Sequence, residues 1–199
     1  MEHFFRITPP LLTVAAFAVW LIWDPSYVPI LTLVAIVVHE FGHLTAAAIL
    51  KVPLGGFRMA SCEARLALSG RLLSYGEEFV ISFAGPLFNL FSLIIFQLWG
   101  GHILGEGAVS FFVTVSAALA LLNLLPISDF DGGRILHCLL APAIGLRVTG
   151  RVCELLSILS LFCLWCMSVY ALIRAGGSLS LFVFSTTLFV RFFIHGPRS

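Results

Sequence analysis

Long apolar segments occupy most of this chain, and they constrain its fold more than any other feature. Most of them approach the roughly 20 residues that a helix needs to cross the hydrocarbon core of a bilayer. With 60% hydrophobic and 11% charged residues among 199, the chain has more apolar side chains than a water-soluble core of this size would use. We therefore expect a single-domain, all-α, polytopic membrane protein with about six transmembrane helices. The expected segments are Thr8–Trp23, Val28–Leu50, Glu78–Trp99, Val109–Leu125, Val152–Ile173 and Ser178–Ile194.

The basic residues predict how these segments are oriented. If all six segments span the membrane, ten of the eleven Lys and Arg residues fall on the side of the N-terminus, and Arg174 alone falls on the other. Cytoplasmic loops carry such an excess of Lys and Arg, so both termini are expected in the cytoplasm. We expect a multi-pass protein of a bacterial cell membrane, in contact with the lipid bilayer. A net charge of +1 without any basic run argues against a nucleic-acid partner.

The loop between the second and third segments is unusual for a linker. It runs from Lys51 to Tyr75 and combines several glycines with apolar side chains. Residues 65–69, Arg-Leu-Ala-Leu-Ser, place leucine at every second position, a period of two that is typical of a β-strand. We predict a membrane-associated β-hairpin over residues 54–72. The alternative is a surface loop that carries a few isolated hydrophobic residues.

Three ionisable residues lie in the middle of the second apolar segment, in the sequence His39-Glu40-Phe41-Gly42-His43. Such residues are costly in lipid and usually have a function. His39 and His43 are four residues apart, so their imidazoles leave one face of a helix and can bind one Zn²⁺. Glu40 would lie beside the metal rather than on it, where it can act as a general base in hydrolysis.

A catalytic zinc site usually has three protein ligands and an open position, so a third ligand is needed. The stretch from Asn123 to Gly133 supplies two candidates, Asp129 and Asp131. We favour Asp131, because Gly132-Gly133 follows it and would let the backbone turn sharply there. Asp129 is the competing candidate, which we interpret as a capping or interfacial acid.

The order of these motifs resembles a known family. His39–His43, followed about eighty residues later by Asn123-x-x-Pro126 and Asp131-Gly132, looks like the metal-binding sequences of the site-2 proteases, which are intramembrane zinc metalloproteases. Gly85-Pro86-x-x-Asn89 is similar to a segment of that family's third helix. The resemblance covers roughly residues 30–140, and the helices over 152–194 are additional. It implies that Asp131 is the third zinc ligand and that Asn123 contacts substrate.

The resemblance also implies a reaction and partners. The expected activity is hydrolysis of peptide bonds in membrane-embedded or membrane-tethered proteins near the cytoplasmic side, with membrane inhibitor proteins as further partners. The edge of the expected hairpin, with Gly55, Gly56 and Phe57, would hold a locally unwound substrate as an added strand. The compact layout is most similar to the branch typified by stage IV sporulation protein FB, whose members activate a pro-sigma factor. That branch typically carries a CBS domain, for which these 199 residues have no room.

Two other classes of protein fit part of the pattern. A membrane metal transporter would use His39, His43 and Asp131 as a transport site, but it would give Glu40 no hydrolytic role. An inactive scaffold of the same fold would not need the complete motif. The three functions differ in whether the protein cleaves a membrane substrate and whether cleavage requires Glu40.

Overall fold

The computed structural model describes residues 20, 23–24, 26–52, 73–174 and 179–195, and all elements among them are helical. Three long helices coincide with the second, fourth and fifth expected segments, and a shorter one with the sixth. The third expected segment corresponds to a helix, α4, together with a π-helical turn, η2, that continues it. The elements are α3 (Tyr27–Ile49), α4 (Tyr75–Ile95), η2 (Phe96–Gly100), α5 (Gly101–Leu104), α6 (Glu106–Asn123), α7 (Asp131–Ile144), α8 (Leu146–Arg174) and α9 (Leu179–His195).

Among the described residues, four helices are long and apolar enough to cross a membrane, namely α3, α4 with η2, α6 and α8. This supports the expectation of an integral membrane protein. The apolar part of α9, Leu181–Phe192, is shorter than the others. The first expected segment is largely outside the described residues, and the expected β-hairpin over 54–72 is wholly outside them. The structure therefore accounts for four of the six expected spans and contains no strand within the described residues.

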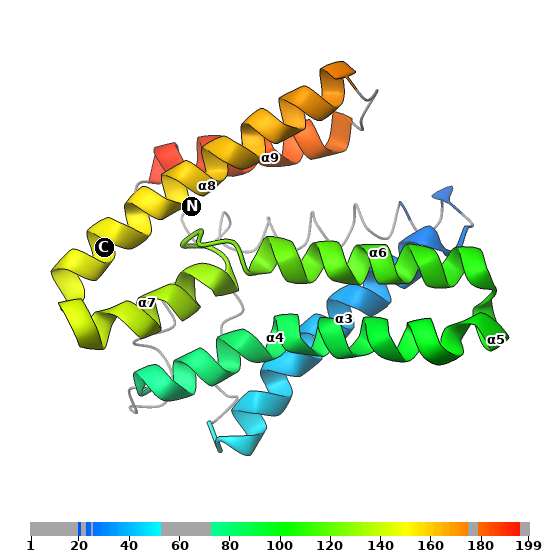
Figure 1. The fold of residues 1–199 in the computed structure, drawn as a ribbon, viewed down its shortest axis with the longest axis horizontal. Helices are drawn as coiled ribbons and strands as arrows, with labels where there is room; N and C mark the ends of the chain where they lie inside the picture. Colours follow the sequence, from blue (N-terminus) through cyan, green and yellow to red (C-terminus); the bar gives the residue numbers. More distant parts are fainter. Residues whose placement is uncertain (1–19, 21–22, 25, 53–72, 175–178, 196–199) are drawn as a thin grey trace, which may run out of the picture.

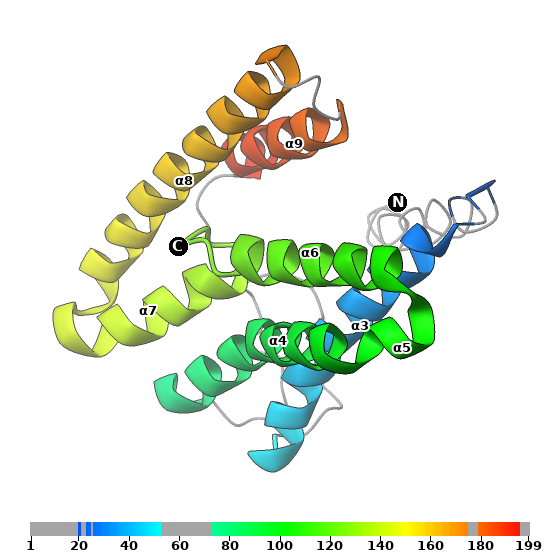
Figure 2. The same cartoon turned by 45° about the vertical axis from the view of Figure 1, so that its right-hand side comes forward.

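Helices α3, α4 and α6 pack against one another and form the main body of the molecule (Figure 1). Helix α7 follows α6 after a short connection and lies against α4. Helices α8 and α9 form an antiparallel pair that joins the rest mainly through α7, as the turned view makes clear (Figure 2). The apolar pattern of the sequence did not predict α7, which is only 14 residues long and contains Pro142.

Two apolar clusters hold α3 against its neighbours. Near the start of α3, Leu31 and Ala35 pack with Phe112 of α6, whose ring stacks on Phe96 at a centroid distance of 3.9 Å. Near its end, Ala46 and Ala47 pack with residues of α4. Small side chains let membrane helices approach closely, and dispersion contacts then stabilise the pair. The histidines of α3 lie between these two clusters.

Gly42 shows how close α3 and α4 come. A Cβ atom at this position would lie 2.6 Å from the carbonyl oxygen of Ala84. Only glycine fits there without moving one helix away from the other. The side chains of His39 and His43 therefore meet the backbone of α4 directly.

Polar pairs link α8 to α9. The hydroxyls of Ser168 and Ser185 are 2.7 Å apart and buried, and the indole N–H of Trp165 donates to Thr186 at 3.2 Å. Hydrogen bonds of this kind between membrane helices each contribute about 0.6 kcal/mol on average. They fix α8 and α9 as one unit, distinct from the α3–α4–α6 body.

Candidate metal centre

His39 and His43 of α3 and Asp131 of α7 come together in the interior. The three residues are 5%, 7% and 7% exposed, although 88 residues of sequence separate His43 from Asp131. The helical spacing of four places both imidazoles on the same face of α3. Asp131 is the first residue of α7, where a negative charge interacts favourably with the helix dipole.

The facing atoms of the three side chains form a nearly equilateral triangle. His39 Nε2 is 3.1 Å from Asp131 Oδ2 and 3.2 Å from His43 Nε2. His43 Nε2 is 3.3 Å from Asp131 Oδ2. A tetrahedral ion with ligand distances of about 2.0–2.1 Å separates its ligand atoms by roughly 3.3 Å. The triangle thus has the size of one face of such a tetrahedron, and the cluster could hold a metal ion.

The tautomer of His43 is fixed by a neighbouring backbone group. Its Nδ1 lies 2.8 Å from the carbonyl oxygen of Ile81, on α4. A carbonyl oxygen can only accept, so Nδ1 carries the proton and donates it. In the neutral ring Nε2 then presents a lone pair toward Asp131 Oδ2, which also presents a lone pair. A cation between these electron-rich atoms relieves their repulsion, so the donor set suits a metal.

Gly85 lets α4 lie against both imidazoles. A Cβ atom there would lie 2.9 Å from His39 Nε2 and 2.5 Å from His43 Cε1, and closer still to His43 Nε2. Any side chain at this position would enter the space where the ligand atoms converge. The backbone of α4 at Gly85 is therefore one wall of the candidate site.

The connection between α6 and α7 carries Asp131 into the cluster, and Ser157 of α8 holds that connection. Ser128 donates its backbone N–H to Ser157 Oγ at 3.0 Å, and the two hydroxyl oxygens are 2.9 Å apart. Ser157 Oγ also lies within hydrogen-bond distance of the carbonyls of Pro126 and Cys153. A single buried hydroxyl thus joins α8 to the segment that presents the acid.

Gly132 and Gly133 do not form the sharp turn expected from the sequence. Both lie in the first turn of α7 with helical geometry, since Gly105 and Gly145 are the only glycines with positive φ in the described part of the chain. A Cβ at either position would collide with backbone of the 124–128 connection. The two glycines are needed for close packing rather than for a turn.

The charge on Asp131 is stabilised within the cluster. Burial raises the pKa of its carboxyl group, but in the metal-free protein hydrogen bonds from imidazoles that carry a proton on Nε2 outweigh this and lower the pKa to about 2. The carboxylate contributes to stability at neutral pH, and that contribution declines only in acid as the pH falls below the ordinary value of 3.8 toward 2. Asp131 is therefore ionised, as a ligand must be.

The other predicted site residues lie differently. Glu40 is half-buried and follows His39 on α3, outside the three-residue cluster. Asn123 ends α6, and its side-chain N–H₂ donates to Leu119 within the same helix at 2.9 Å. Asp129 is exposed and 4.0 Å from Arg191, which agrees with its interpretation as an interfacial acid. Gly55, Gly56 and Phe57 lie outside the described residues.

Several residues of this site were not identified as such from the sequence. The contacts of Ile81, Gly85 and Asn89 with the histidines all come from one face of α4, where these residues recur every four positions. The Gly85-Pro86-x-x-Asn89 segment was the available signal, but its role was not assigned. Ser157 had no signal at all.

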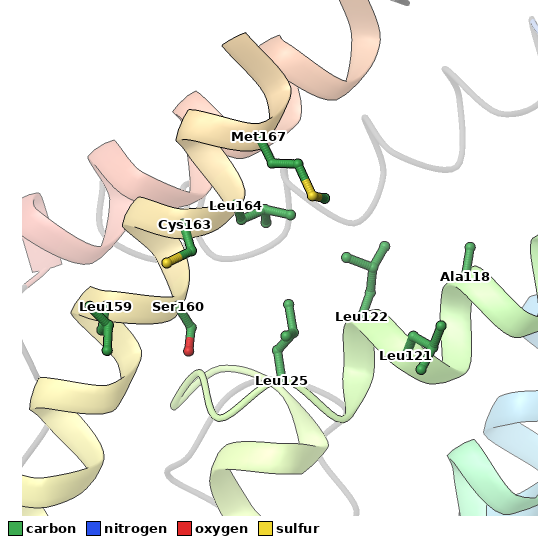
Figure 3. Close-up of a pocket in the computed structure, with 9 residues that line it drawn as sticks. All are labelled: Ala118, Leu121, Leu122, Leu125, Leu159, Ser160, Cys163, Leu164 and Met167. Carbon is green, nitrogen blue, oxygen red and sulfur yellow. The ribbon is translucent and has the colours of Figure 1, made fainter. Parts of the chain in front are cut away.

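An apolar pocket of about 440 Å³ lies between α6 and α8, apart from the cluster (Figure 3). Leucines form most of its wall, Cys163 and Met167 of α8 line the other side, and Met167 points toward the leucines of α6. None of the three cluster residues lines it. Its apolar lining suits a hydrocarbon chain rather than polar reactants. The lining residues are Ala118, Leu121, Leu122, Leu125, Leu159, Ser160, Cys163, Leu164 and Met167.

The fold and the cluster together define an all-helical membrane protein with a buried His-His-Asp group that could hold a metal. No model of a known protein family matches the chain, and no curated protein sequence matches it. The fold is similar to that of the site-2 protease from Methanocaldococcus jannaschii, with a TM-score of 0.61 and 19% identity over 90% of this chain and 84% of that one. This likeness extends to the site-2 protease fold and does not select the stage IV sporulation protein FB branch.

Proposed function

We propose that this chain, over residues 1–199, is one intramembrane zinc metalloprotease domain that hydrolyses peptide bonds of membrane-embedded or membrane-tethered proteins. The observation that carries this proposal is the buried triangle of His39 Nε2, His43 Nε2 and Asp131 Oδ2, with sides of 3.1–3.3 Å. The similarity of the fold to a site-2 protease supports it independently of the motif.

Zinc is the metal that we propose. Two imidazoles and one carboxylate in a tetrahedral arrangement form a common ligand set for catalytic zinc, with a fourth position open. Magnesium and calcium prefer more oxygen ligands and larger coordination numbers. Zinc bound here would polarise a substrate carbonyl and make a water molecule more acidic.

Glu40 is proposed as the general base and then the general acid. It lies next to His39 on α3 but outside the ligand cluster, so it would not be used as a metal ligand. It would accept a proton from the attacking water and return it to the amine of the leaving peptide. Asn123, at the end of α6, is proposed to contact the substrate through the amide groups that remain after one N–H donates to Leu119.

Two features of the sequence support a reaction near the cytoplasm. His43 lies eight residues before Lys51, or about 12 Å along the helix axis at 1.5 Å per residue. The bias of basic residues supports the proposal that this end of α3 lies on the cytoplasmic side of a bacterial membrane. Gly55, Gly56 and Phe57 remain our candidates for holding an unwound substrate. A sporulation pro-sigma factor as the substrate depends on sequence resemblance alone.

The test is cleavage of a co-expressed membrane substrate, or of a purified one in detergent, by the wild-type protein and the Glu40→Gln variant. We expect the variant to keep its fold and zinc but to lose at least about a hundredfold in rate, since general acid–base catalysis contributes about 10²–10⁴. Turnover by Glu40→Gln close to that of the wild type would refute the assignment of Glu40. Zinc transport without cleavage would favour the transporter class instead.

A further inference from the structure

Asn89 of α4 is fully buried and in contact with a ligand histidine. Its exposed fraction is 0%, and its Nδ2 lies 3.3 Å from Nδ1 of His39. Its other amide atom, Oδ1, has no hydrogen-bond partner within the described part of the chain. A buried polar atom without a partner costs about 1–3 kcal/mol, so this residue needs an explanation beyond packing.

The chemistry of His39 supplies an explanation for the buried amide of Asn89. To bind a metal through Nε2, the neutral ring must carry its proton on Nδ1, which is then a donor that needs an acceptor. The amide of Asn89 has an acceptor, Oδ1, and a half-turn of the amide would bring it against Nδ1. The rotation would lose no bond made by Oδ1, because that atom has no partner in its present position.

The neighbouring histidine shows the same arrangement already complete. His43 donates Nδ1–H to the carbonyl of Ile81, which can only accept. Ile81 and Asn89 are eight residues apart on α4 and flank Gly85, which faces both imidazoles. One face of α4 thus meets the outer nitrogen of each histidine while leaving both inner nitrogens directed at Asp131.

We propose that Asn89 is a positioning residue of the metal site: its side-chain oxygen accepts the Nδ1 proton of His39 and thereby holds Nε2 as a metal ligand. The inference rests on the proposed metal function of the cluster. It assigns a physical role to the Asn89 position of the Gly85-Pro86-x-x-Asn89 segment. Loss of such outer partners commonly costs metal sites about 10–100-fold in affinity.

Two substitutions separate an acceptor from a merely structural side chain. Asn89→Asp keeps an oxygen acceptor of the same size and removes the amide donor. Asn89→Leu fills a similar volume and removes both. Ser92→Ala is the matched control, since Ser92 is also buried on α4 and donates its hydroxyl to the backbone carbonyl of Asn89, at 2.9 Å, without touching a histidine.

The experiment uses the full chain in detergent. Zinc affinity is measured by competition with a chromogenic chelator, and the visible spectrum of the cobalt-loaded protein reports ligand geometry. We expect Asn89→Leu to bind zinc about 10–100-fold more weakly and to change the cobalt spectrum. Asn89→Asp and Ser92→Ala should keep both properties within about threefold of the wild type. Thermal unfolding of each variant checks that the fold persists.

Two results would overturn the inference. One is an Asn89→Asp variant that loses zinc and alters the cobalt spectrum as Asn89→Leu does, which would show that the oxygen acceptor is not what matters. The other is an Asn89→Leu variant with wild-type affinity and spectrum. A wild-type protein that binds neither zinc nor cobalt would refute the proposed metal function itself. Failure of the Asn89 role alone would instead leave metal binding by the wild-type protein intact.

Discussion

The close approach of Gly85 to the imidazoles makes Gly85→Ala the most informative single substitution. The added Cβ would lie 2.5 Å from His43 Cε1 and 2.9 Å from His39 Nε2, whereas ordinary contacts are 3.4–4 Å. One ring, or the whole of α4, must therefore move by roughly 1 Å, since the repulsive part of the van der Waals potential is steep. Overpacking of this kind typically costs about 1–3 kcal/mol.

This cost should appear mainly in metal binding, because the rings can relieve the collision by leaving the positions in which both Nε2 atoms face Asp131. A loss of 1–3 kcal/mol corresponds to about 5–150-fold weaker zinc binding. We also expect slower peptide cleavage. The assays are zinc competition with a chelator, and cleavage of a membrane substrate at saturating zinc.

Gly76→Ala is the matched control. It makes the same substitution on the same helix, but a Cβ there meets nothing within 4 Å. Helix propensity favours alanine in the middle of α4 by about 0.5–1 kcal/mol, so this term opposes any loss seen in Gly85→Ala and cannot cause it. If Gly85→Ala bound zinc as tightly as Gly76→Ala and cleaved at the same rate, the close packing of α4 on the imidazoles would be wrong.

Three further predictions test other parts of the site and the topology. Asp131→Ala should lose most of its zinc and all cleavage, while Asp129→Ala should keep its zinc; metal analysis of both purified variants checks this, and the reverse result would exchange their roles. Ser157→Ala should lower stability by about 0.5–1.5 kcal/mol in thermal unfolding, because it removes the hydrogen bonds between Ser157 Oγ and Ser128, while Ser160→Ala should have little effect. Comparable losses in both serine variants would count against the anchoring role. A single cysteine near Arg65, in a cysteine-free background, should react with an impermeant reagent only after intact cells are permeabilised; labelling of intact cells would reverse the proposed orientation.

The sequence predicted the long helices well because each has a continuous apolar run bounded by charged or helix-breaking residues. Expected segments Val28–Leu50 and Val109–Leu125 correspond closely to α3 and α6. The helical spacing of His39 and His43 likewise predicted that both side chains share one face. The apolar runs and the histidine spacing are local features, so each can be recognised within a short stretch of sequence.

The rest of the site depends on contacts between distant segments. The approach of Gly85 to the imidazoles and the bonds of Ser157 to the α6–α7 connection arise only when α4 and α8 have packed in place. Helix α7 is short, and its Gly132-Gly133 was interpreted as a turn because glycine permits one. Its actual role is to bring the first turn of α7 against the 124–128 backbone, a requirement that no local pattern displays.

A charge balance explains why a carboxylate, rather than a third imidazole, would suit this position as the remaining ligand. Zinc with two neutral imidazoles keeps both of its positive charges, and a net charge in a low-dielectric interior is costly. Asp131, which contacts both histidines, would remove one of these charges and leave the site with a single positive charge. Apolar helices could then surround the site at a lower electrostatic cost than with a third neutral imidazole.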